Sequence, residues 1–270
     1  MTLSVLTLNL WNNSGPYEQR RALIRRWIER LQPDVIGFQE ALRGASFDQM
    51  VELVDGFGYP FGAYAPAIRF WGDDRYEFGN AIASRWPFAS VGACPLPDAG
   101  DAEKRVALTA LIDAPFGLVP LSCTHLNWKL HHGWVRERQA VALGETARRY
   151  RQDTDFPPIL VGDFNAEPES AEIRYLTGLQ SLEGRSVHFF DAWRLRGTGD
   201  PATWSNRNAY ARAALEADRR IDYIFCGPPR PDGVGLVEEC RVVCDAAEDG
   251  VWPSDHFGLF ARLRTEPLDA

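Results

Sequence analysis

The chain of 270 residues lacks any apolar run that approaches the roughly 20 residues a membrane-spanning helix requires. Residues 1–10 also lack the basic cluster and the unbroken apolar block of a secretory signal peptide, and they alternate as a strand does. We therefore expect no membrane segment and a cytoplasmic location.

Cysteine is scarce: the chain has five, and no two of them form a Cys-x-x-Cys pair. An odd number at irregular spacing argues against a disulfide framework. Cys123 and Cys226 lie inside apolar runs, as buried free thiols do. The sequence thus predicts free cysteines in a reducing compartment.

Positive charge is in short supply, because 29 Lys and Arg residues stand against 37 Asp and Glu residues, for a net charge of −8. Non-specific binding to nucleic acid depends on a basic surface that displaces counterions from the phosphates. A local basic groove can coexist with a negative total charge. The balance therefore disfavours tight binding to long duplexes without excluding a nuclease.

No repeat, low-complexity tract or long linker divides the chain, so we expect one domain over residues 1–265 and a short tail at 266–270, with fraying after residue 264. Strand patterns outnumber helical ones, which favours an α+β sandwich of two sheets with helices outside. Helical spacing predicts helices at residues 18–31, 47–54, 133–151 and 169–176. Short apolar runs predict strands at residues 3–8, 34–38, 81–84, 89–93, 106–112, 119–124, 159–161, 221–226, 239–244 and 256–263.

Polar groups close or interrupt these apolar runs at six places. A lone polar residue at a strand end is usually a turn or cap residue, but the recurrence suggests side chains that converge in space. On an extended backbone, Asp163 and Asn165 would point to the same face and could meet one ligand together. The six places are Asn9, Glu40, His125, Asp163 with Asn165, Asp222, and Asp255 with His256.

Carboxylate oxygens suit Mg²⁺ or Mn²⁺, and a metal can neutralise charge on a phosphate ester. Glu40 follows an apolar run and is a candidate metal ligand, with Asn9 beside it. Asp255 is a candidate second ligand.

The remaining polar groups match the other needs of phosphate ester hydrolysis, which are an oriented water and donors for the transition state. Asp163 could hold and deprotonate the water. Asn165, His125 and His256 could donate to the phosphate. Asp222 could pair with His256, fix its tautomer and keep it cationic.

These motifs together resemble the endonuclease/exonuclease/phosphatase (DNase I-like) superfamily, which includes nucleases, sphingomyelinases, inositol-polyphosphate phosphatases and tyrosyl-DNA phosphodiesterases of the second type. One motif alone would be weak, but the set falls in the family's order over nearly the whole chain. With histidine at position 125, the chain resembles the DNase I, sphingomyelinase and tyrosyl-DNA phosphodiesterase branches more than the abasic endonucleases, many of which have tyrosine there. The matching segments are residues 6–9, 37–40, 123–126, 162–165, 220–224 and 254–256.

The resemblance implies a four-layered α/β/β/α sandwich of two mainly antiparallel sheets, with the site at one end. It implies magnesium-dependent hydrolysis of a phosphate ester, with manganese as a possible substitute. By motif match, Glu40 takes the role of metal ligand with Asn9 in support, and Asp255 that of a metal or water contact. Asp163 matches the water-orienting base and Asn165 the phosphate-binding residue. His256 matches the transition-state donor and Asp222 its orienting partner.

Weaker signals concern substrate binding. Asn127, Trp128 and Lys129 follow His125 and could form a pocket wall, or an ordinary loop leading to the helix at residue 133. Asn80 could approach the substrate or simply start a strand. The aromatic residues at 70–76 surround acidic ones, which suits a rim or a packed edge better than a phosphate groove. Residues 203–220, with four arginines, are another candidate wall.

Three functions remain in view. The first is a metal-dependent phosphatase or phosphodiesterase acting on a phosphorylated small molecule, which the acidic composition favours. The second is a nuclease or DNA-end-processing phosphodiesterase, which His125 and the aromatic loops allow. The third is a non-catalytic binding module, against which the full set of polar residues argues. No feature of the sequence points to an obligate protein partner.

Overall fold

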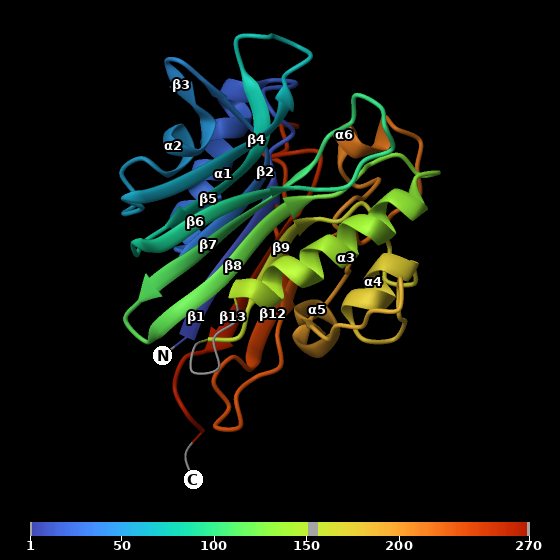
Figure 1. Cartoon of the computed structure of the whole chain (residues 1–270). Helices are drawn as coiled ribbons and strands as arrows, with labels where there is room; N and C mark the ends of the chain where they lie inside the picture. The colour runs from blue at the N-terminus through green and yellow to red at the C-terminus, as the bar shows by residue number, and fades with distance from the viewer. Residues whose placement is uncertain (1, 151–155, 269–270) are drawn as a thin grey trace.

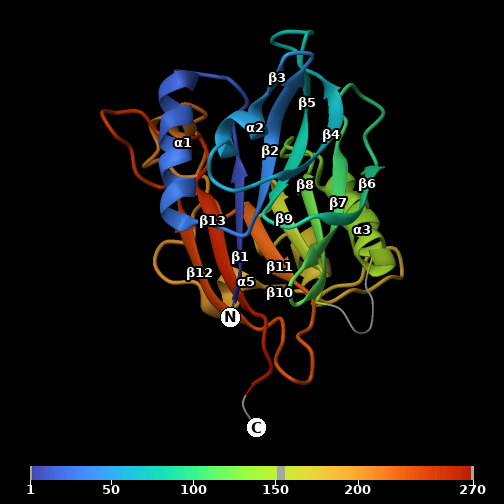
Figure 2. The same cartoon turned by 90° about the vertical axis from the view of Figure 1, so that its left-hand side faces the viewer.

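The structure, a computed structural model, describes residues 2–150 and 156–268. Two β-sheets pack face to face and carry helices on both outer faces, so the layers run α/β/β/α (Figures 1 and 2). Helices α1 (Tyr17–Leu31) and α2 (Gln49–Val54) cover one outer face, and α3 (Gly133–Tyr150) and α4 (Ala171–Leu176) cover the other. The sandwich predicted from the sequence is confirmed.

The first sheet contains both ends of the described chain. Its strands are antiparallel except for β1 and β2, which run parallel and are joined through α1. In spatial order they are β12 (Val237–Val243), β13 (Gly258–Arg264), β1 (Thr2–Asn9), β2 (Val35–Gly44), β5 (Glu77–Ser84) and β4 (Phe61–Arg69), with β3 (Phe47–Asp48) pairing with β2.

The second sheet repeats this logic. Its one parallel pair is β8 and β9, joined by α3, because parallel neighbours need a long crossover. In spatial order the strands are β10 (Phe190–Asp191), β11 (Asp222–Cys226), β9 (Ile159–Asp163), β8 (Gly117–His125), β7 (Val106–Ala114) and β6 (Phe88–Pro95). Short helices α5 (Ala192–Arg196) and α6 (Ala209–Arg212) lie in the connections around β11.

The central strands are apolar on both faces because each face is covered. In β1, Val5 packs into the core between the sheets, while its neighbour Leu6 packs into the core beneath α1. In β9, Val161 faces the other sheet and Leu160 faces α3 and α4. Burial on two sides explains why β9 appears in the sequence as a continuous apolar run, and why β1 is buried on both faces although Ser4 and Thr7 interrupt its apolar residues.

Several predicted elements differ from the observed ones. Strand β4 was missed because its alanines, its Gly62 and its Pro66 give a weak strand signal. The segment predicted as a helix at 47–54 starts with β3, and the helix begins at Gln49 after the Asp48 carboxylate caps it by accepting the Val51 N–H. Strand β2 continues to Gly44, beyond its predicted end at residue 38.

Three further predictions concern the C-terminal residues, the end of the long helix and the division into domains. Thr265 is buried and the Leu268 N–H donates to the Asp232 carbonyl, so the fraying expected after residue 264 is not found up to residue 268. The predicted helix end at Arg151 lies outside the described residues. The division into one domain and a tail stays a prediction.

The membrane and cysteine expectations can be compared directly with the structure. Within the described residues, no helix is long and apolar enough to cross a membrane. All five cysteines lie in the described ranges and form no disulfide, and four of them are buried, as the sequence predicted for Cys123 and Cys226.

Gly162 allows β9 to run close against β8 just before the polar end of the strand. Its φ is +145°, and a Cβ at this position would lie 1.9 Å from the Thr124 carbonyl oxygen. No side chain fits there without moving the strand that carries His125. The glycine therefore sets the spacing between His125 and Asp163, which are paired across these strands.

We expect Gly162→Ala to lower the free energy of unfolding by more than the roughly 1–3 kcal/mol that backbone strain alone costs, because the clash with Thr124 adds to the strain. Gly184→Ala is the matched control, since Gly184 also has a positive φ, +70°, but nothing within 4 Å. Chemical denaturation would measure both. Equal losses in the two variants would show that the close approach does not matter.

Candidate active site

A cavity of about 1050 Å³ opens at the end of the sandwich where β1, β8 and β9 finish. This end lies opposite the start of β1 and the end of β13 (Figure 1). Two more predicted residues, Asn9 and Asp222, are buried and bonded to this group of side chains without lining the cavity. Of the predicted site residues, those that line it are Glu40, His125, Trp128, Lys129, Asp163, Asn165, Asp255 and His256.

The Asp163 carboxylate is the meeting point of the site. Its Oδ2 accepts a hydrogen bond from Asn9 Nδ2 at 3.1 Å and lies 3.3 Å from His125 Nε2 and 3.7 Å from His256 Nε2. Its Oδ1 accepts the backbone N–H of Asn165 at 2.9 Å. Burial raises the pKa of Asp163 to about 6, although the neighbouring His256 lowers it. A carboxylate with such a pKa can exchange a proton near neutral pH.

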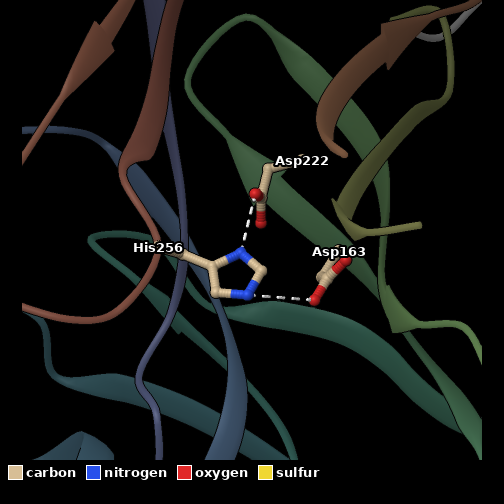
Figure 3. Close-up of side chains that lie close together, drawn as sticks. All are labelled: Asp163, Asp222 and His256. Carbon is tan, nitrogen blue, oxygen red and sulfur yellow. Dashed lines mark hydrogen bonds and ion pairs between the residues drawn. The ribbon is translucent and has the colours of Figure 1, made fainter. Parts of the chain in front are cut away.

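His256 lies between two carboxylates (Figure 3). Its Nδ1 is 2.9 Å from Asp222 Oδ2, and its Nε2 faces Asp163. Burial alone would lower the pKa of His256, but Asp222 and Asp163 raise it well above its usual value. The imidazole is therefore held as a cation that can donate from both nitrogens, which is the pairing predicted from the sequence.

His125 has the opposite protonation state. Arg105 Nη1 lies 2.9 Å from His125 Nδ1, and because arginine can only donate, Nδ1 must be the unprotonated acceptor. The remaining proton is then on Nε2, which points to Asp163. Burial, Arg105 and His256 together hold the pKa of His125 well below its usual value. The site thus contains one neutral and one cationic histidine around a single carboxylate.

Glu40 reaches the cavity from a bulge in β2. Its φ is +56°, and the pairing of β2 with β5 shifts register between Phe38 and Ala41. Asn9 Nδ2 lies 3.4 Å from its Oε1, and Asn12 Nδ2 donates to its Oε2 at 3.0 Å. The Asn9 oxygen accepts the N–H of Trp11 and its amide nitrogen faces the carboxylates, so Asn9 supports the Glu40 side chain, and its role as a metal ligand stays a prediction. Burial raises the pKa of Glu40.

Asp255 is positioned by the loop before β13. Ser254 Oγ donates to the Asn9 carbonyl and also lies 3.2 Å from Asp255 Oδ1, which ties this loop to the end of β1. Fully buried Arg20 donates to the carbonyls of Leu10 and Pro253, joining the same two segments from α1. Burial raises the pKa of Asp255 to about 6.

The donor set fits a hard divalent cation. Burial raises the pKa of Glu40, of Asp163 and of Asp255, and a neighbouring carboxylate raises each of them further. Negative charge is therefore crowded in this part of the cavity. Mg²⁺ keeps several waters and is held by one or two carboxylates together with substrate oxygens, so two cavity-lining carboxylates are sufficient.

A second group of three possible metal ligands also lies at the site. In the part of the chain that the structure describes, the one group of three His, Cys, Asp or Glu residues with ligand atoms all within 4.8 Å is Asp163, Asp222 and His256. Both ring nitrogens of His256 face carboxylates, so a metal at His256 would have to displace a proton that Asp222 and Asp163 stabilise. We therefore favour Glu40 and Asp255 as the residues that could hold the ion.

Three of the predicted placements differ from the structure. Asn165 has a φ of +51°, so it does not continue the extended backbone of Asp163, although both side chains reach the cavity. Asn80 donates to the Val106 carbonyl, and the Asn127 oxygen accepts the Lys129 N–H. Neither of these two lines the cavity, so the predicted substrate contacts of Asn80 and Asn127 find no support in their positions.

The strand ends were also only partly right. Asp163 ends β9, but Asp222 begins β11, and His256 precedes β13. Asp222 and Asp163 are direct partners across the antiparallel pair. In an antiparallel sheet the start of one strand lies beside the end of its neighbour, so both positions reach the same edge.

Three supporting residues were missed. Asn12 follows Asn9 by three positions, close enough to have been considered with it. Arg105 begins no recognisable motif, because its partner His125 comes from the neighbouring strand. Arg20 looks like an exposed charge on a helix, yet it is completely buried and donates to backbone carbonyls.

The fold and the site together define an α/β/β/α protein with a buried acid–histidine centre at one end of paired sheets. The sequence profile of the Endonuclease/Exonuclease/phosphatase family matches residues 6–256. Nocturnin from Mus musculus is 24% identical over 266 residues, which cover 90% of this chain and 57% of that protein. The chain thus spans little more than half the length of the curated relative.

Solved structures show the same fold. The D. rerio TDP2 complexed with single strand DNA product has a TM-score of 0.76 at 19% identity and covers 97% of this chain and 99% of that chain. The human Nocturnin catalytic domain with bound sulfate anion has a TM-score of 0.74 at 21% identity, with coverage of 97% and 93%. The chain belongs to the Endonuclease/Exonuclease/phosphatase family, part of a superfamily of metal-dependent phosphoesterases and nucleases.

We expect Arg105→Met to raise the pKa of His125 and to release its tautomer, because the guanidinium both repels a second proton and occupies Nδ1. Lys104→Met is the matched control, since Lys104 pairs with Asp98 and not with His125. Nitrogen chemical shifts of the histidine side chains, followed against pH, would report both changes. An unchanged His125 titration in Arg105→Met would refute the assignment.

Proposed function

We propose that this protein is a divalent-metal-dependent phosphoesterase that hydrolyses a phosphate mono- or diester by in-line attack of an activated water. The observation that carries this proposal is the Asp163 carboxylate, whose pKa is raised to about 6 and whose Oδ2 lies 3.7 Å from His256 Nε2 at the wall of an open cavity. A base and a cationic donor side by side suit attack on a phosphoryl group.

Each polar side chain has a role in this proposal. Asp163 orients the water and accepts its proton. His256, kept cationic by Asp222, donates to a phosphoryl oxygen as charge develops there. His125 donates from Nε2 without adding charge. Asn165 gives one amide hydrogen to the Leu126 carbonyl, and the other stays available for phosphate.

The metal proposal rests on Glu40 and Asp255, with magnesium as the expected ion and manganese as a substitute. When bound, a divalent ion neutralises charge on the phosphate oxygens. Asn9 and Asn12 hold the Glu40 carboxylate in place from behind. A cytoplasmic location is also a proposal, and the absence of disulfides among the five cysteines fits a reducing compartment.

A small phosphoester is favoured over nucleic acid because most cations that line the cavity are paired with acids, although exposed Arg69 forms no ion pair within the described residues. Lys129 pairs with Asp101 at 2.6 Å, Arg105 with Glu103 at 2.5 Å, and Arg219 with Glu216. Lysine and arginine side chains that are already neutralised release few counterions when a polyanion binds. The sulfate in the Nocturnin catalytic domain fits a site for a tetrahedral anion, and the single-strand DNA product of TDP2 keeps the nuclease alternative open.

We expect Asp163→Asn to lower kcat for a nitrophenyl phosphate ester by about 10²–10⁴-fold with little change in KM, because it removes the base but keeps the shape. Asp113→Asn, at an exposed position on β7, should retain full activity. Steady-state hydrolysis of p-nitrophenyl phosphate and bis-p-nitrophenyl phosphate with magnesium would measure this. Equal rates for wild type and Asp163→Asn would remove the basis of the proposal.

The same panel, extended to plasmid DNA and short single strands, separates the two functions. A phosphatase or small-molecule phosphodiesterase should prefer the small esters and respond weakly to salt. A nuclease should prefer DNA and lose activity steeply as salt rises, because it must displace counterions from many phosphates.

We expect the affinity for Mg²⁺ to rise with pH through about 6, because Asp255, with a pKa of about 6, and Glu40, with a raised pKa, must lose protons before they bind a cation. Binding should therefore release protons at pH 6, which calorimetry in two buffers of different ionisation enthalpy detects. Glu40→Gln should abolish binding, whereas Glu29→Gln, exposed on α1, should not. A pH-independent affinity would contradict the assignment.

A further inference from the structure

We propose that the side of the cavity next to His125 is a binding site for a planar aromatic group carried by the phosphoester substrate. The site is formed by Phe78 and Trp71, which we call the aromatic wall. This inference rests on the proposed function only in placing the substrate phosphate at Asp163 and the two histidines. It adds the chemical class of the group attached to that phosphate.

The aromatic wall runs from the catalytic group to the cavity mouth without interruption. The Phe78 ring centroid lies 6.4 Å from that of His125, and the Trp71 ring centroid lies 5.0 Å from that of Phe78. Both side chains line the cavity. Phe78 is buried and forms the back of the wall, so Trp71 offers most of the surface to a group esterified to a phosphate beside His125.

Trp71 is held in place but is not covered. Its ring packs at 5.0 Å on Phe70 and on Phe78, two buried residues of the small core cluster beneath it. Even so, 69% of the Trp71 surface is exposed. A fixed, exposed indole at a cavity edge is available for stacking. Because packing already holds the ring in place, little conformational entropy is lost when a ligand binds.

Most charges at the rim beyond the aromatic wall are paired, and Arg69 is an exposed cation among the lining residues. Trp128, which is 56% exposed, also lines the cavity, and its Nε1 donates to Glu103 at 2.9 Å. The same Glu103 neutralises Arg105, which lies 6.0 Å from the Phe78 ring centroid. Neutral aromatic surface next to paired charges matches an uncharged planar group better than a second phosphate.

The wall favours a planar ring over an aliphatic chain because stacking adds to the burial of apolar area. Stacking of a base or ring changes affinity by about 5- to 150-fold on alanine substitution. An aryl group and a nucleobase share this chemistry. The test therefore includes one ligand of each kind.

The experiment compares non-hydrolysable phosphonates in calorimetry: an ethyl, a naphthyl and an adenine-bearing phosphonate. Wild-type protein should bind at least one of the ring-bearing compounds about tenfold more tightly than the ethyl compound. Trp71→Ala should lose this preference and bind the ethyl compound within about twofold of wild type. Trp71→Phe, which keeps a ring, should retain part of it, and this guards against misfolding as the cause.

Trp134→Ala is the matched control, because Trp134 is 49% exposed but does not line the cavity. It should bind all three compounds as wild type does. Preference for the naphthyl compound alone would identify an aryl ester, and preference for the adenine compound alone a nucleotide. Equal binding of ring and ethyl compounds to wild type, no binding at all, or an unchanged preference in Trp71→Ala would overturn the inference.

Failure of the proposed function gives a different result. Phosphonate binding does not depend on turnover, so a protein that binds rings through Trp71 but hydrolyses no ester would refute only the hydrolase. A protein whose hydrolysis depends on Asp163 but which shows no ring preference would refute only the aromatic wall.

Discussion

One buried carboxylate oxygen joins the two sheets at the functional end of the molecule. Asp163 Oδ2, at the end of β9, contacts Asn9 from β1, His125 from β8 and His256 from the loop before β13. The three partners come from segments that are far apart in sequence. Asn9 belongs to the opposite sheet, and the loop that carries His256 leads into β13 of that sheet. A buried carboxylate needs such partners, because an unpaired charge in the interior is strongly destabilising. The same contacts that stabilise Asp163 therefore assemble the site.

The two histidines show how neighbours decide the chemistry of identical side chains. Arginine at one ring nitrogen keeps His125 neutral, while carboxylates at both nitrogens keep His256 cationic. Three carboxyl groups with raised pKa complete a centre that is short of positive charge. Such a centre suits a divalent cation and a phosphoryl group together, since the cation neutralises negative charge and the phosphoryl oxygens complete its coordination. The packed core beneath holds these groups in place and limits relaxation.

Much of the site could be predicted because its residues follow or precede apolar runs that must be buried strands. Asp163, His125 and Glu40 were found in this way, and the order of the motifs identified the family. Residues whose importance depends on a partner from another segment could not be found. Arg105 matters only because β7 lies beside β8, and Arg20 only because α1 packs over two loops. Asn80 and Asn127 do not line the cavity, because a position along the chain does not fix the direction of a side chain, and their substrate contacts stay predictions.

The sequence by itself indicated the layers of the fold, since strand patterns outnumber helical ones and the ordered motifs resemble a family of four-layered sandwiches. It also determined the kinds of ligand and acid–base groups, since these are properties of the residues. Only the tertiary structure decided which groups meet and in which protonation state. Strand pairing set Asp222 against Asp163, a bulge turned Glu40 into the cavity, and burial raised the pKa of Glu40, Asp163 and Asp255. The physical reason is that contact and desolvation depend on distance in space, which the order of residues along the chain does not specify.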